Sequence, residues 1–254
     1  MAGPPRTTVR PGPATRSEPT PPAYADRPSG RSQLPGPVAP RPPGPRWQIC
    51  LPPWRGAGTL EGMERPAETL SHGPARLRRW RVSDAEVVYR VVSDCLDHLR
   101  PWMPWVEGYD RASADQFMAL CEHDWDAGVA YHYAILSGGA VAGSCGLMRR
   151  AGPDGMEIGY WLHPAYTGRG LATAASAALV EQAFALPRVD QVVIVHDLAN
   201  TASSGIPRRL GFDQVDRRAR PQPDSPGEAG VDLVWRLTRE QAARLAGEGA
   251  WPPG

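Results

Sequence analysis

The clearest periodic pattern in the chain lies at residues 156–162, where two kinds of side chain alternate. One face of the predicted element carries Met156, Ile158, Tyr160 and Leu162, and the other carries Glu157, Gly159 and Trp161. This period of two is typical of a β-strand. Pro164 ends the strand because proline has no N–H group for a ladder. Residues 171–186 contain no helix breaker and predict a helix shortly after it.

Similar patterns predict the elements on either side of this strand. Strands are expected at residues 77–80, 131–136, 140–148, 191–196, 213–217 and 231–237. Helices are expected at residues 83–99, 113–127, 200–210 and 238–245, the first opened by a capping box of Ser83 and Glu86. The sequence therefore predicts the α/β class, as an α+β mixed sheet with one internal strand–turn–helix ligand site.

Composition separates residues 1–62 from the rest of the chain. This segment holds sixteen of the 29 prolines and eight arginines against three acidic residues, without a periodic apolar run. It has too little apolar surface to offset the entropy of ordering, so we predict a disordered Pro/Arg-rich segment. Three interpretations stay open: a passive tail, an arginine-bearing arm for a nucleic acid or another anionic partner, or a translation start at Met63.

Charge, hydropathy and cysteine spacing argue against several classes of protein. The chain contains no lysine, and from residue 63 onward 24 acidic residues outnumber 20 arginines. No run of eighteen apolar residues occurs, so we expect a soluble, cytoplasmic protein without a membrane or nucleic-acid partner, as a monomer or homodimer. The cysteines lack metal-site spacing and are interpreted as free thiols, buried where they fall in predicted elements. They are Cys50, Cys95, Cys121 and Cys145.

The turn between the central strand and its helix carries Gly168-Arg169-Gly170. Glycines allow positive φ and close approach of the backbone, and the first N–H groups of a following helix form an anion site. Glycines at such a turn also occur for steric reasons alone, so the turn by itself is weak evidence for phosphate binding. It is neither a P-loop, which requires lysine, nor a dinucleotide fingerprint, since Thr173 stands where a third glycine would be.

Four motifs together resemble the GNAT superfamily of N-acyltransferases, and most closely its RimJ/RimL-like branch. They are the strand Ile158-Gly-Tyr-Trp161, the turn Gly168-Arg-Gly170, Asn200-x-x-Ser203 and Leu210-Gly-Phe212. The resemblance covers roughly residues 75–245 and implies a GNAT-like acyl-CoA N-acyltransferase fold in a domain at residues 63–250. It also implies an N-acetyltransferase with acetyl-CoA as co-substrate and no metal.

The resemblance assigns the cofactor-binding residues motif by motif. They are Trp161, Leu162, Gly168, Arg169, Gly170, Leu171, Ala172, Thr173 and Asn200. Backbone N–H groups of the turn would hold the pyrophosphate, and the pantetheine arm would lie beside the central strand. A strand amide near Trp161 would stabilise the oxyanion. Ala165 departs from the family pattern, which often has Gln or Arg at that place.

The resemblance also implies two catalytic residues. Glu157 matches a strand glutamate that acts as general base, through water; the alternative is a solvated side chain paired with an arginine. Ser203 matches a serine that relays a proton to the leaving thiolate, because the tyrosine that many members use is Pro207 here. Three tyrosines stay open as proton donors, and the histidines are interpreted as structural. The tyrosines are Tyr131, Tyr133 and Tyr160.

The segment 99–105 is rich in proline and tryptophan, and the family resemblance places such a segment along the acceptor cleft. By that resemblance Trp102 and Trp105, with Glu107, bind the amine substrate; the alternative is a lid on the core. A weak base suffices for an amine of low pKa, which favours a protein N-terminal α-amine, as in ribosomal proteins, over lysine. A small-molecule amine stays open, as does a catalytically silent acyl-CoA-binding or interaction module.

Overall fold

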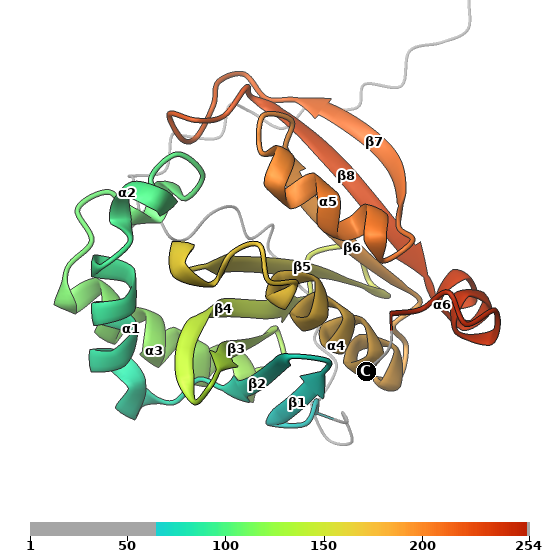
Figure 1. Ribbon diagram of the computed structural model, residues 1–254, viewed down its shortest axis with the longest axis horizontal. Helices are drawn as coiled ribbons and strands as arrows, with labels where there is room; N and C mark the ends of the chain where they lie inside the picture. Colours follow the sequence, from blue (N-terminus) through green and yellow to red (C-terminus); the bar gives the residue numbers. More distant parts are fainter. Residues whose placement is uncertain (1–64, 253–254) are drawn as a thin grey trace, which may run out of the picture. The chain divides into compact units, whose positions relative to one another are not determined.

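The computed structural model describes residues 65–252, which form one eight-stranded sheet with helices on both faces (Figure 1). The strand order is β1-β2-β3-β4-β5-β6-β8-β7, and only β5 and β6 run parallel. The predictions for residues 1–62, Cys50 and the start at Met63 lie outside the described residues. The strands are β1 Thr69–His72, β2 Ala75–Arg79, β3 Ala130–Ser137, β4 Ala140–Met148, β5 Gly155–Leu162, β6 Gln191–Asp197, β7 Asp213–Ala219 and β8 Val231–Thr238.

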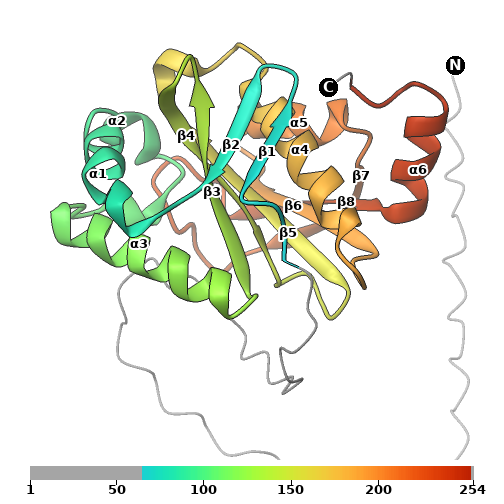
Figure 2. The same cartoon turned by 90° about the horizontal axis from the view of Figure 1, so that it is seen from below.

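The helices form two layers, which Figure 2 shows on opposite sides of the sheet. The first layer contains α1 (Ala85–Ser93), α2 (Leu96–Leu99) and α3 (Arg111–Asp126), with α1 on β4 and α3 on β3. The second contains α4 (Leu171–Ala185) and α5 (Thr201–Arg209), and α6 (Arg239–Gly247) lies against β8. Within residues 65–252 no helix is both long and apolar enough to cross a membrane.

Helix α4 is the main packing element of its layer and contacts β1, β2, β4 and β5. Five of its buried residues are alanine, whose small side chains let the helix axis approach the sheet closely. The larger residues Leu171, Leu179 and Val180 then fill the remaining space in the same core. A separate core on the other face is built around Trp80, Met118 and Cys121. The two cores hold the two faces of β5 in place.

Nearly all the predicted elements are present, with ends shifted by a few residues. Three details differ from the predictions. Strand β1 was missed because its sequence Thr-Leu-Ser-His has one large apolar residue and no alternation. The predicted helix at 83–99 is divided into a 3₁₀ turn (Val82–Asp84), α1 and α2.

The predicted capping box of Ser83 and Glu86 is also wrong. The side chain that closes the turn is Asp84, whose Oδ2 accepts a hydrogen bond from the Arg81 N–H at 2.9 Å. The same carboxylate receives two hydrogen bonds from Arg78, at 2.8 and 3.0 Å. Glu86 instead pairs with Arg90 one helical turn later. Asp84, which pairs with a strand arginine, thus closes the 3₁₀ turn that precedes α1.

Candidate active site

The sheet opens at one place, between the C-terminal halves of β5 and β6. The parallel ladder runs from Gly155↔Gln191 to Ile158↔Ile194 and then ends. Beyond it β5 stays paired with β4 as far as Leu162, while β6 stays paired with β8 as far as Asp197. Each strand therefore continues along its outer neighbour. The inner edge of β5 at residues 159–162 has no strand partner on the β6 side.

The direction of the backbone groups along this edge follows from the ladder with β4. The His163 N–H donates to the Ala142 carbonyl at 2.9 Å, so His163 points its backbone groups toward β4. Backbone groups alternate sides along a strand, so those of Trp161 also point toward β4. Those of Tyr160 and Leu162 point into the opening. An oxyanion donor near Trp161 stays a prediction, and at this edge it would be the N–H of Tyr160 or Leu162.

The glycine turn and the N-terminus of α4 lie directly after β5. Gly168 has φ 71° and Gly170 has φ 76°, a conformation that other residues rarely adopt. Gly170 is the N-cap, and it contributes no side chain to cap the helix. Its carbonyl accepts from the Ala174 N–H, which leaves the N–H groups of residues 171–173 without a carbonyl of their own helix. This exposed turn is suited to bind an anionic group.

The N-terminus of α5 borders the opening from the β6 side. Asn200 is its N-cap, and its Oδ1 accepts a hydrogen bond from the Ser203 N–H at 3.1 Å. Within residues 65–252 the Asn200 side-chain NH₂ makes no hydrogen bond, so it can still donate to a ligand. The Tyr160 hydroxyl donates to the Ser203 carbonyl at 3.3 Å and so reaches from β5 to α5. The opening is thus bordered by Tyr160, Asn200 and Ser203.

Tyr160 is the tyrosine that the structure brings to this site. Burial raises its pKa to about 12, although the hydrogen bond to Ser203 acts in the opposite direction. The hydroxyl therefore keeps its proton at neutral pH. Tyr131 is fully buried in the core, and the Tyr133 hydroxyl donates to the Ala67 carbonyl instead. Pro207, which replaces the tyrosine of many relatives, is buried within α5.

Aromatic side chains form a wall on the other face of β5. The rings of Trp105 and Trp161 lie 6.2 Å apart, and Trp105 meets Tyr109 edge-on at 6.0 Å. Tyr89 of α1 stacks on Tyr109 at 6.2 Å. The structure therefore joins a residue predicted for the acceptor, Trp105, to one predicted for the cofactor, Trp161. This contact links the segment before α3 to the central strand.

The other two residues predicted to bind the amine, Trp102 and Glu107, lie outside the aromatic wall. Trp102 is half-buried near the C-terminal end of α2, where its N–H donates to the Leu99 carbonyl. Glu107 follows the short 3₁₀ turn Pro104–Val106, and its side chain is exposed. Both lie on the segment that carries Trp105, and neither contributes to the aromatic wall. Their role in binding a substrate stays a prediction.

Glu157 lies on the same face of β5 as Trp161, four residues earlier. Its Oε1 lies 2.6 Å from Arg150 Nη2, and its side chain is 18% exposed. The ion pair is the alternative that the sequence left open. A half-buried carboxylate on the face of the aromatic wall is also compatible with a proton acceptor reached through water. The pairing with Arg150 and the predicted role as base do not exclude each other.

His196 lies at the end of β6, next to the opening, and its hydrogen bonds define its protonation state. Nδ1 lies 2.9 Å from the Asp197 carbonyl and must donate, since a carbonyl only accepts. Nε2 lies 2.9 Å from the Trp235 indole N–H and must accept. Burial lowers the pKa of the imidazole, which favours this neutral form. His196 is therefore structural, as the sequence predicts.

The sequence did not identify three residues that shape this region. Tyr89 and Tyr109 extend the aromatic wall, and Asp197 is a buried carboxylate at the end of β6. An aspartate directly after a buried β-branched strand was the available signal for Asp197. Cys95, Cys121 and Cys145 are free and buried, as expected. Within the described range no cluster of His, Cys, Asp or Glu side chains is able to hold a metal ion.

The chain is similar to known acetyltransferases in both sequence and fold. Residues 75–213 match the family described as Acetyltransferase (GNAT) domain. A curated relative from Bacillus subtilis (strain 168), named "Putative ribosomal N-acetyltransferase YdaF", is 29% identical over 141 residues, which is 54% of this chain and 76% of that protein.

Two solved structures share the fold. Mycobacterium smegmatis RimJ in complex with CoA-disulfide has a TM-score of 0.62 at 23% identity, covering 72% of this chain and 93% of that one. RimL, the ribosomal L7/L12 α-N-protein acetyltransferase in complex with coenzyme A, has a TM-score of 0.64 at 18% identity, covering 68% and 99%. At these identities the two structures establish the fold only.

We expect His196 to remain neutral at pH 6, with the proton on Nδ1, because both ring nitrogens are engaged and burial opposes the charge. The pKa of His196 is lowered on folding, so the unfolded state binds the proton more readily, and stability should fall as the pH drops below about 6.5. Long-range ¹H–¹⁵N NMR of the imidazole would report the tautomer, and a His196→Gln variant assigns the signal. Imidazolium shifts for His196 at pH 6 would contradict the assignment.

Proposed function

The chain belongs to the GNAT acetyltransferase family, and we propose that it transfers the acetyl group of acetyl-CoA to the N-terminal α-amine of a protein. The observation that carries this proposal is the opening between β5 and β6, with a helix N-terminus at its end and an aromatic wall on its other face. The curated relative is named for ribosomal N-acetylation, which supports a ribosomal protein as the acceptor. Such an acceptor would place the reaction in the cytoplasm.

The groups around the opening suit the chemical parts of acetyl-CoA. The N–H groups at residues 168–173 point their partial positive charge at a place where a pyrophosphate would be held. The Tyr160 and Leu162 backbone groups would pair with the amides of the pantetheine arm, as a neighbouring strand would. The Asn200 side-chain NH₂ would donate to the same arm. Acetyl-CoA would supply the reactive thioester, and the protein would hold the two reactants in position for the transfer.

The acceptor would approach from the face of Trp105 and Trp161. Aromatic faces attract cations, so this wall would hold the protonated amine before it loses its proton. An α-amine has a pKa near 7.7–8.0 and is about one tenth neutral at pH 7, whereas roughly a few lysine side chains in ten thousand are neutral. Glu157, the proposed base, is a carboxylate and therefore a weak one. The site therefore favours an amine that needs little help to deprotonate.

The proposed reaction is a direct attack of the neutral amine on the acetyl carbonyl. Glu157, acting through a water molecule, would accept the amine proton. The Tyr160 or Leu162 N–H would donate to the oxyanion. The C–S bond then breaks, and the thiolate of CoA would take a proton relayed through the Ser203 hydroxyl, which regains a proton from water in the same step. Tyr160 is a second donor beside Ser203, since its hydroxyl remains protonated and lies against the Ser203 carbonyl.

The substrate class can be tested with four short peptides that have a free or blocked N-terminus, each with and without an internal lysine. We expect transfer to both peptides with a free N-terminus, and a rate at least about a hundredfold lower when the N-terminus is blocked, as the neutral fractions imply. Mass spectrometry would locate the acetyl group. Equal transfer to lysine in a blocked peptide would contradict the proposal. Transfer only to small amines would assign the site to a small-molecule acceptor.

Glu157→Gln should lower kcat/KM for a free N-terminal peptide at pH 7 by roughly a hundredfold, the usual contribution of a general base. The amide keeps the shape of the side chain and can still accept a hydrogen bond from Arg150, so the fold should not change. Arg150→Gln is the companion variant, which removes the ion pair but leaves the carboxylate. If Glu157→Gln retained full activity, the glutamate would serve only as the partner of Arg150.

Ser203→Ala should lower kcat by about tenfold or more and change KM for acetyl-CoA less, because the hydroxyl would act on the leaving sulfur. Ser204→Ala is the matched control, since the Ser204 hydroxyl donates to the Thr201 carbonyl within the same turn. Tyr160→Phe distinguishes the two donors by steady-state kinetics. A normal kcat with a raised KM in Ser203→Ala would assign Ser203 to cofactor contact alone.

A further inference from the structure

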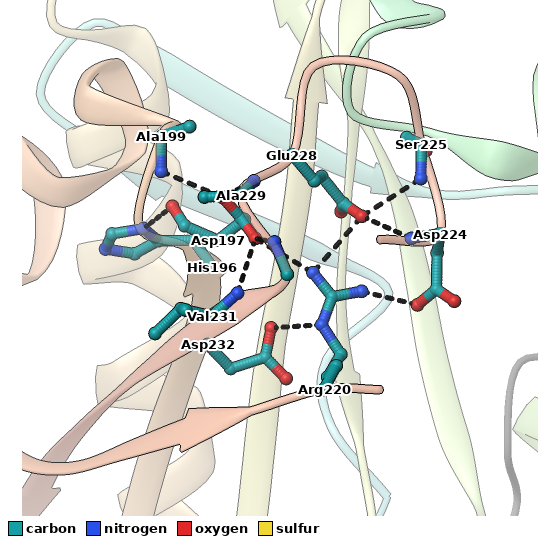
Figure 3. Close-up of polar contacts among 11 residues, drawn as sticks. His196, Asp197, Ala199, Arg220, Asp224, Ser225, Glu228, Ala229, Val231 and Asp232 are labelled. Atoms are coloured by element: carbon teal, nitrogen blue, oxygen red, sulfur yellow. Dashed lines mark hydrogen bonds and ion pairs between the residues drawn. The ribbon is translucent and has the colours of Figure 1, made fainter. Parts of the chain in front are cut away.

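The most completely bonded side chain in this part of the fold is Asp197, at the end of β6 (Figure 3). Its side chain is 1% exposed. Its two carboxylate oxygens accept four backbone hydrogen bonds and one from the guanidinium of Arg220, at 2.9 Å. The backbone donors are Ala199 at 2.8 Å, Ala229 at 2.8 Å, Gly230 at 2.9 Å and Val231 at 3.1 Å.

A buried carboxylate is stable only when such donors replace its water. Burial acts to raise the pKa of Asp197, but the N–H donors of Ala229, Ala199 and Val231, with Arg220, outweigh burial, so the pKa lies below its ordinary value. Asp197 is therefore ionised at neutral pH. Its charge fixes the backbone at residues 229–231, which enter β8, and at Ala199, which precedes the N-cap of α5.

Arg220 extends the same network to the other end of the loop between β7 and β8. Its guanidinium lies within 2.5–3.1 Å of four carboxylates. They belong to Asp197, Asp224, Glu228 and Asp232. Glu228 in turn accepts from the N–H groups of Asp224 and Ser225 at 2.8 and 3.0 Å. The loop at residues 220–230 is thus held in one conformation by charge-assisted hydrogen bonds.

The far side of this loop contacts the segment 99–105, which carries Trp102 and Trp105. The Gly227 N–H donates to the Pro101 carbonyl at 3.0 Å. A Cβ added to Gly227 would lie 2.6 Å from Pro101 Cβ and 2.7 Å from the Pro101 carbonyl oxygen, so only glycine fits there. Pro101 stands four residues before Trp105, whose ring meets Trp161 of β5. Contacts therefore run from the end of β6, through the loop, to the aromatic wall.

We propose that Asp197 is a positioning residue for the acceptor: it fixes the 220–230 loop against Pro101 and so sets the place of Trp105 relative to β5. This rests on the proposed function, because the acceptor is assigned to the aromatic wall. Asp197 touches neither substrate in this account. Its effect on the acceptor side passes through the loop. Asp197 also holds Ala199 beside the N-cap Asn200, whereas the glycine turn and α4 lie outside its contacts.

The inference is tested by steady-state kinetics of two variants with a free N-terminal peptide and acetyl-CoA. Asp197→Asn turns one acceptor oxygen into a donor facing N–H groups, and Gly227→Ala pushes the loop off Pro101 without changing Asp197. Both should raise KM for the peptide by about tenfold, because each displaces the loop that positions Trp105. Gly227→Ala, which lies away from the start of α5, should change KM for acetyl-CoA less. Asp216→Asn on exposed β7 is the matched control and should change neither constant.

Unchanged peptide KM in both variants, or equal rises in both Michaelis constants in Gly227→Ala, would overturn the inference. Amide hydrogen exchange provides a readout that does not need catalysis. In Asp197→Asn the amides of residues 227–231 should exchange faster, while those of β3 and β4 keep their rates. If the wild type failed to acetylate any peptide, the proposed function would fail, whereas unaltered exchange at residues 229–231 would refute the anchoring by Asp197.

Discussion

The parallel ladder between β5 and β6 ends after Ile158 and Ile194, and the rest of the site depends on this early end. Both strands continue, each bonded to its outer neighbour, so neither loses its shape where they separate. Unpaired strand groups normally invite another strand or water. Here they face a narrow opening inside the sheet, bordered by Tyr160 and the start of α5. An extended ligand with amide groups can pair with them as a strand would.

Two different packing layers keep the two strands apart. The alanine-rich helix α4 lies close to β5 on one face, while the aromatic wall packs Trp161 on the other. The end of β6 is held separately, by its ladder with β8 and by the buried Asp197 carboxylate. The site is therefore built where independent parts of the structure meet. Across the opening, the Tyr160 hydroxyl reaches the start of α5.

Much of this site could be predicted from sequence because it depends on local signals. The alternation at residues 156–162, the glycines at 168 and 170 and the helix that follows are each encoded by neighbouring residues. Asn200 at the N-cap of α5 is also a local signal, because its side chain accepts a hydrogen bond from an N–H group three residues later. The relative faces of Glu157 and Trp161 also follow from a period of two. Family resemblance then supplied the chemistry that the pattern alone did not.

What the sequence did not predict depends on contacts between distant residues. The partner of Glu157 is Arg150, seven residues away across a strand turn, and nothing in the local pattern selects it over other arginines. The role of Asp84 in closing the turn before α1 depends on Arg78 in another element. The donors to Asp197 come from more than thirty residues along the chain as well as from its neighbours. Such partners are defined by the tertiary fold.

Amide hydrogen exchange with and without acetyl-CoA tests the central claim most directly, that the cofactor occupies the opening and pairs with the inner edge of β5. The account predicts slower exchange on binding at Tyr160 and Leu162 and at residues 168–173. Residues 157 and 158, already paired on both sides, should change little. Protection confined to another surface, or none at Tyr160 and Leu162 under saturating acetyl-CoA, would contradict it.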